Sequence, residues 1–133
     1  MSHLTPIQPD GWATPKGYSN GMVGQGRMLF VGGQIGWNAQ CEFETDDLVE
    51  QVRQTLRNVL DVVRTAGGGP EHIATMTWYL TDKQDYLRNL KEIGRAYREE
   101  MGRHFPAMAA VEVKALIEDR AKVEIQAIAV LPA

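Results

Sequence analysis

The stretch from Phe105 to Val130 places the strongest constraint on the fold. It predicts two strands, residues 107–116 and 122–130, joined by a charged turn over residues 117–121. Apolar and polar side chains alternate in both with the period of two that half-buried strands show. One face of each strand is therefore expected to be apolar, with Val111 and Val113 on that face of the first. The other faces are mixed and suit a subunit contact or a pocket, and they carry Met108, Glu112, Gln126, Ile128 and Val130.

Three further segments have clear periodicity. Residues 46–66 predict a helix, because apolar residues recur every three or four positions and Thr45 can cap its start. Residues 72–81 alternate as a strand. A second helix is predicted over residues 83–101, with Asp82 as its cap. Its arginines, Arg88, Arg95 and Arg98, are expected on the solvated side.

The N-terminal part is less regular. Residues 1–20 contain three prolines and are expected to be extended or loop-like. Short strands over residues 21–25 and 27–33 would form a hairpin around Gln25 and Gly26. The predicted order is β-β-α-β-α-β-β, an α+β two-layer sandwich with two helices on one face of a mixed sheet. Association with copies of itself would cover the other face.

Composition limits the classes of function. The 133 residues predict a single domain, residues 1–133. A net charge of -3 argues against strong nucleic-acid binding. The chain shows no signal peptide and no apolar run long enough for a membrane span, so a cytoplasmic protein is expected. Cys41 is the only cysteine, and the three histidines lack metal-ligand spacing, so no metal site is expected.

Four blocks resemble the signature of the RidA/YjgF family. They are residues 15–19 (PKGYS), residues 29–36 (LFVGGQIG), the FPA of 105–107 leading to the VEV of 111–113, and residues 123–129 (VEIQAIA). Their order and spacing extend the resemblance over nearly the whole chain. The resemblance implies a chorismate-mutase-like fold and a homotrimer whose sheets face inward, with small-molecule ligand clefts between subunits. Its best known members hydrolyse enamines and imines, such as 2-aminoacrylate, to a 2-keto acid and ammonia without metal or cofactor.

The resemblance also implies site residues. Tyr18 and Gln126 become the candidate catalytic residues. The candidate substrate-binding residues are Ser19, Gly32, Gly33, Gln34, Met108 and Glu112. Three of these positions depart from the family pattern. Met108 replaces an arginine that binds the substrate carboxylate, Gln126 replaces a glutamate that positions or activates water, and Gly32 replaces a serine.

Structural roles remain open for several of these residues. Tyr18 fits a subunit contact as well as a ligand contact, and Met108 fits simple interface packing. Glu112 fits either a ligand site or an ion pair.

Three functions are compatible with the sequence. The first is an imine or enamine deaminase of altered specificity. The second is a non-catalytic trimer that binds a small molecule or regulates. The third, an L-PSP-type endoribonuclease, is disfavoured by the acidic charge and the lack of a histidine pair.

Overall fold

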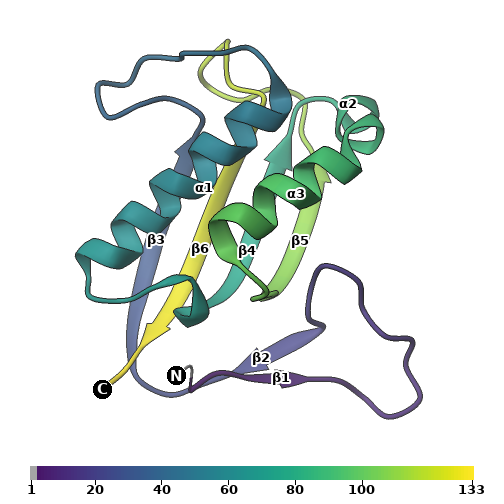
Figure 1. Cartoon of the computed structure of the whole chain (residues 1–133), viewed down its shortest axis with the longest axis vertical. Coiled ribbons are helices and arrows are strands. Elements are labelled where there is room, and N and C mark those ends of the chain that lie inside the picture. Colours follow the sequence, from purple (N-terminus) through teal and green to yellow (C-terminus); the bar gives the residue numbers. More distant parts are fainter. Residues whose placement is uncertain (1–2) are drawn as a thin grey trace.

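The computed structural model describes residues 3–133. Figure 1 shows two long helices lying across one face of a sheet, and a separate small hairpin near the N-terminus. The elements in chain order are β1 (Thr5–Ile7), β2 (Gly21–Val23), β3 (Arg27–Ile35), α1 (Leu48–Thr65), the 3-10 turn η1 (Pro70–His72), β4 (Ile73–Leu80), α2 (Lys83–Arg88), α3 (Leu90–Met101), β5 (Ala107–Glu112) and β6 (Val123–Leu131). This is the α+β two-layer arrangement expected from the sequence.

The main sheet has the strand order β3-β6-β4-β5. β6 runs antiparallel to both of its neighbours, and β4 pairs with β5 in parallel. The two strands that were predicted to follow one another, β5 and β6, are therefore not adjacent, because β4 lies between them. β5 also ends at Glu112, well before the predicted end at Leu116.

The predicted hairpin around Gln25 and Gly26 is wrong. β2 pairs instead with β1, which belongs to the segment expected to be extended or loop-like, and the two make a separate two-stranded sheet. β3 pairs with β6 from Arg27 onward. At the turn, Gly26 has φ of +157° and lies against the Leu131 carbonyl, where a Cβ atom would collide with backbone.

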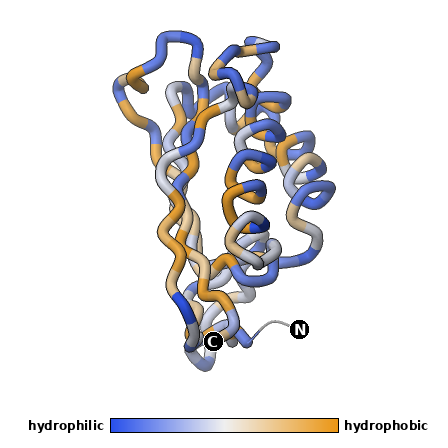
Figure 2. The backbone as a smooth tube through the Cα atoms, turned by 90° about the vertical axis from the view of Figure 1, so that its left-hand side faces the viewer, coloured by the Kyte–Doolittle hydropathy of each residue, from blue (hydrophilic) through white to orange (hydrophobic). Residues whose placement is uncertain are grey.

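The core lies between the helices and the sheet, and Figure 2 shows the apolar side of the helices turned toward the strands. In α1 the buried stripe includes Val52, Leu56, Val59 and Leu60, all fully inaccessible to solvent. Burial of each such side chain contributes about 1.5–3 kcal/mol. The helix starts two residues later than predicted, because Asp47 rather than Thr45 caps it by accepting a hydrogen bond from Glu50 N.

The second predicted helix is divided in two. Asn89, with φ of −113° and ψ of 17°, separates α2 from α3. The predicted cap is confirmed, since the Asp82 carboxylate accepts hydrogen bonds from the backbone of Gln84 and Asp85. α2 has no buried residue, whereas α3 buries Ile93, Ala96, Tyr97 and Met101.

The face of the sheet that points away from the helices is called the open face below. Strand register places on it Met28, Phe30, Thr77, Tyr79, Val111, Gln126 and Ile128. Three of its apolar side chains are strongly exposed, with Phe30 at 69%. An apolar surface of this kind marks an interaction site.

Within residues 3–133, none of the helices combines the length and the apolar character needed to cross a membrane.

Candidate functional site

A pocket of about 460 Å³ lies on the helix side of the sheet. It is bordered by β4, β5, α2, α3 and the loop between β1 and β2. Its aromatic lining residues are Tyr18, Trp78, Tyr86, Tyr97 and Phe105. Leu90, Ile93, Met108 and Ala110 add aliphatic surface, and the charged lining residues are Lys16 and Arg98. A largely apolar concave site with a few polar groups is the usual form of a small-molecule site.

Four of the rings form a continuous series. Tyr86 meets Trp78 edge-on with ring centroids 6.5 Å apart, and Trp78 lies 6.4 Å from Tyr97. Tyr97 in turn stacks on Phe105 at 5.6 Å. Such contacts add about 0.5–1.5 kcal/mol per pair beyond burial. They fix one wall of the pocket in place before any ligand binds.

Ser19 connects the N-terminal loop to this wall. Its amide donates to Pro106 O at 3.0 Å, and its hydroxyl donates to Phe105 O at 2.5 Å. A single parallel bridge also pairs Ser19 with Ala107. The PKGYS and FPA segments are thereby held together, so that Tyr18 and Met108 line the same pocket.

The prediction of which face of β5 packs on the core is wrong, because Met108 and Glu112, and not Val111, lie on the helix side of the sheet. Met108 is in register with the buried Met76 and packs against the core below the helices. Val111, expected in the core, instead lies on the open face and is 45% exposed.

Gln126 lies on the opposite face of the sheet from Met108. It is in register with Thr77, and its Oε1 accepts a hydrogen bond of 2.7 Å from Tyr79 OH. Within one chain the sheet therefore separates Met108 from Gln126, although both were predicted on the mixed faces of their strands.

Glu112 also lies on the helix side, in register with Leu80. Its carboxylate accepts a 2.7 Å hydrogen bond from Lys83 N, the first residue of α2. Negative charge at a helix N-terminus is stabilising. Glu112 thus has a structural partner and is absent from the pocket lining.

The glycine segment of β3, Gly32 and Gly33, lies away from the pocket of its own chain. Gly32 and Gly33 fall in the irregularity between Val31 and Gln34, where the β3–β6 register shifts. The Glu124 carboxylate covers Gly33 so closely that a Cβ there would collide with it. Gln34 Nε2 donates to Gly32 O at 3.2 Å. β3 and β5 are opposite edges of the sheet, so these residues do not meet the pocket of their own chain.

Sequence reasoning missed several lining residues. Trp78, Tyr86 and Tyr97 lie in the strand predicted over residues 72–81 and the helix predicted over residues 83–101, and apolar periodicity does not separate them from core positions. Aromatic residues on a strand and a facing helix are the signal that could have indicated this wall of the pocket. Arg98 is exposed, as predicted, and its side chain also borders the pocket. Periodicity gave no signal for this contact, because a long side chain can reach sideways from an exposed helix position.

The buried phenols are not bases at neutral pH. Burial raises the pKa of Tyr97 far above its usual value and also raises that of Tyr86. Tyr97 OH stays protonated and donates a 2.6 Å hydrogen bond to His104 O. No group of three or more potential metal ligands occurs among residues 3–133.

This pKa shift predicts a pH effect on stability. In the unfolded chain Tyr97 ionises near 10.0, whereas the folded protein keeps its proton to higher pH. Its contribution is fully present below the unfolded pKa and is lost as pH rises toward the folded one, by about 1.4 kcal/mol per pH unit. We expect Tyr97→Phe to be less stable at neutral pH by about 1 kcal/mol, for the lost hydrogen bond. The difference should shrink or reverse near pH 11 in urea unfolding, and a constant difference would contradict the assignment.

Comparison with known proteins places this arrangement in a family. The model of the family described as "Endoribonuclease L-PSP" matches residues 11–131. A RutC family protein of Pasteurella multocida is 37% identical over 108 residues, covering 81% of this chain and 83% of that protein. Escherichia coli K12 TdcF, described as "Putative reactive intermediate deaminase", is 34% identical over 108 residues, with 81% and 82% covered.

The similarity extends to solved structures. The Yersinia pestis protein YyfB, described as a protein of unknown function of the conserved Rid family, matches with a TM-score of 0.86 and 29% identity over 97% of this chain and 99% of that one. The chain belongs to the Rid (RidA/YjgF) family, to which the endoribonuclease L-PSP model corresponds.

Proposed function

We propose that this protein is a homotrimeric hydrolase that deaminates a reactive imine or enamine. The observation that carries the proposal is that Tyr18 and Met108, from two separate signature segments, line one preformed pocket. Membership of the Rid family, and the description of TdcF as a reactive intermediate deaminase, support this class of reaction.

The two faces of the sheet support the proposed trimer. The exposed side chains of Met28, Phe30 and Val111 make the open face suitable for contact with other subunits. Because the sheet separates Gln126 from Met108 within a chain, only Gln126 of a neighbouring subunit could approach the pocket. We therefore place the complete site between two subunits, with the pocket of one closed by the open face of the next.

The reaction needs little from the protein. Water adds to the carbon of the C=N bond, a proton moves to nitrogen, and the C–N bond breaks to release ammonia and leave a carbonyl. A neighbouring Gln126 amide would orient the water without taking its proton. Tyr18 would supply a hydroxyl beside the reacting nitrogen. Positioning is the main contribution, since a reactive imine has a low intrinsic barrier.

A non-catalytic binding protein is the second candidate. Met108 and Gln126 both replace a charged group of the family pattern with an uncharged one, which favours ligand binding over turnover. Ligand binding without acceleration of imine hydrolysis would support this candidate. The endoribonuclease alternative gains nothing from the pocket, since its described lining includes no histidine.

Turnover of 2-aminoacrylate should be weak. A charge-assisted contact contributes about 1.5–3 kcal/mol, so its absence at Met108 should reduce the rate by about ten- to a hundredfold relative to an arginine-bearing relative. An assay that generates the enamine in situ and follows release of keto acid measures this directly. Turnover equal to that of the relative would contradict the prediction.

Restoring the arginine and the glutamate of the family pattern tests whether positions 108 and 126 act in one site. Met108→Arg and Gln126→Glu together should raise the rate by more than the product of the two single effects, because groups in one catalytic unit are not additive. Met108→Leu, which keeps the apolar volume, is the matched control. Strictly multiplicative effects would mean that the two positions do not share an intersubunit site.

A further inference from the structure

The pocket lining has a distinctive charge balance. Its described lining residues include two cations, Lys16 and Arg98, and no aspartate or glutamate. Five aromatic rings surround the remaining volume. Rings alone would also attract a cationic ligand, by about 0.5–2 kcal/mol. Two like charges at the rim oppose such a ligand, whereas an anion is attracted by both.

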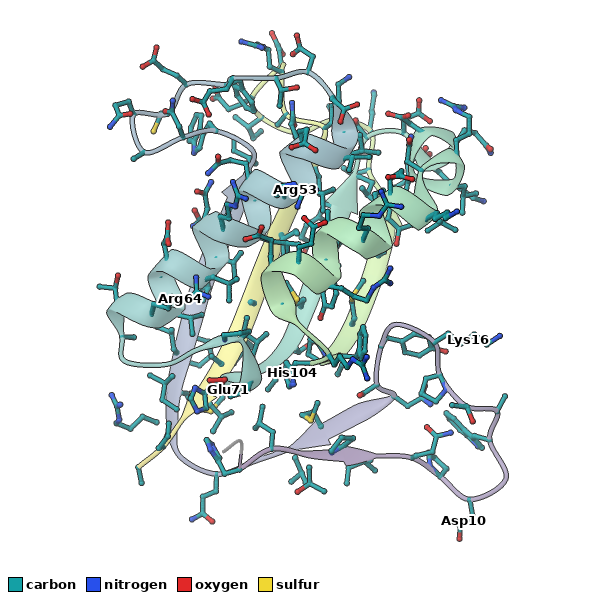
Figure 3. The ribbon with its side chains drawn as sticks, viewed as in Figure 1. Asp10, Lys16, Arg53, Arg64, Glu71 and His104 are labelled. Atoms are coloured by element: carbon teal, nitrogen blue, oxygen red, sulfur yellow. The ribbon has the colours of Figure 1, made fainter. Side chains whose placement is uncertain are left out.

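Arg98 is the better placed of the two cations. Gly94 lies one turn before it in α3 and also lines the pocket. A Cβ at Gly94 would come within 3.3 Å of Arg98 Nη1. The absence of a side chain at Gly94 therefore leaves room for the guanidinium of Arg98. Lys16 extends outward from its loop, away from the sheet and helices (Figure 3).

The guanidinium of Arg98 is also available. Within residues 3–133 its side chain makes no ion pair and no hydrogen bond, whereas Arg95 on the same helix pairs with Glu92 at 3.2 Å. An unpaired arginine at the rim of an apolar pocket can bind a carboxylate through two parallel hydrogen bonds.

We infer that the pocket selects carboxylates with a bulky aromatic or branched apolar body, and that Arg98 binds the carboxylate that Met108 cannot. The apolar body lies against the series of rings, and Met108 contributes a flexible apolar contact in place of a charge. The inference rests on the proposed function for the location of the ligand site. It assigns the substrate class of that site: imines of large apolar 2-keto acids rather than 2-aminoacrylate.

Binding of stable probes tests this without any turnover. In calorimetric titrations of the full chain, 3-phenylpropionate should bind more tightly than propionate, which lacks the ring, and than 3-phenylpropionamide, which lacks the charge. Arg98→Gln should weaken 3-phenylpropionate about tenfold and leave the amide unchanged. High salt should weaken binding to the wild type and have less effect on the variant.

One matched variant controls for loss of a surface charge. Arg95→Gln removes a cation from the same helix at a position outside the pocket lining. Its binding of 3-phenylpropionate should stay within about twofold of the wild type. Equal binding of the amide and the carboxylate, no binding of 3-phenylpropionate, or an unchanged Arg98→Gln would overturn the inference. Binding without hydrolysis would instead count against the proposed deaminase and leave the ligand class standing.

Discussion

Phe30→Asp should convert the proposed trimer into monomers. Phe30 is 69% exposed on the open face, so the substitution removes little packing within its own chain. In a trimer the ring would be buried, which is worth about 1.5–3 kcal/mol, and a carboxylate in its place would lose its hydration. Each subunit contact should therefore weaken by at least about tenfold. Light scattering after size-exclusion chromatography measures the mass, and circular dichroism checks that the monomer remains folded.

Ile117→Asp is the matched control. Ile117 is 95% exposed, but it lies in the loop between β5 and β6 and not on the open face. This variant should remain a trimer. Imine hydrolysis should fall with Phe30→Asp and not with Ile117→Asp, because only the first removes the neighbouring subunit. A wild-type monomer, or a trimeric Phe30→Asp, would show that the open face is not the interface.

Of the substitutions predicted here, Gln51→Leu should cause the largest loss in the free energy of unfolding. Gln51 is completely buried. Its Nε2 donates to Thr45 O at 3.0 Å and to Arg120 O at 2.9 Å, while Oε1 accepts from Lys122 N at 2.9 Å. Leucine would leave three backbone groups without partners. Because water can reach some of them, we expect a loss of about 2–4 kcal/mol in the free energy of unfolding, measured in urea at a fixed protein concentration.

Gln54→Leu provides the comparison within α1. Within residues 3–133, Gln54 Nε2 donates only to Asn58 Oδ1, one turn along the same helix. Its replacement should change stability by less than about 0.5 kcal/mol. Similar losses in the two variants would mean that helix propensity, rather than the three buried hydrogen bonds, determines the effect.

Local sequence patterns predicted where helices and strands form better than they predicted which strands pair with each other. The stripe of α1 and the alternation of β4 are properties of a few consecutive residues, and both elements formed where expected. The pairing of β2 with β1 depends on the direction that the chain takes at Gly26. A period of two identifies a strand without naming its neighbour.

The face of β5 that packs on the core could not be read from the sequence because both faces carry apolar residues and neither is predominantly polar. Met108 faces the helices and Val111 faces the open side, and either would suit a core. Binary patterning specifies a face only where the other is polar. The division of the second helix at Asn89 had no signal in the apolar spacing, which continues through the break.

The candidate site was predicted in part. The family pattern pointed to Tyr18 and Met108, which line one pocket, and to Ser19, which holds the two segments together. It gave no indication of Arg98 or of the series of rings, because these belong to positions that packing alone would explain. Gly32, Gly33, Gln34 and Gln126 lie away from this pocket in their own chain, and their assignment to a site remains a prediction.

The position of β6 has a consequence for how the chain folds. It is the last of the described strands in chain order, yet it lies inside the sheet and, among those strands, it alone pairs with β3. Until β6 has been synthesised, β3 has no partner and the sheet cannot close across its centre. The contact between Ser19 and Phe105 also joins segments 86 residues apart, so loop closure must precede it. Closure of the main sheet must therefore follow synthesis of nearly the whole chain.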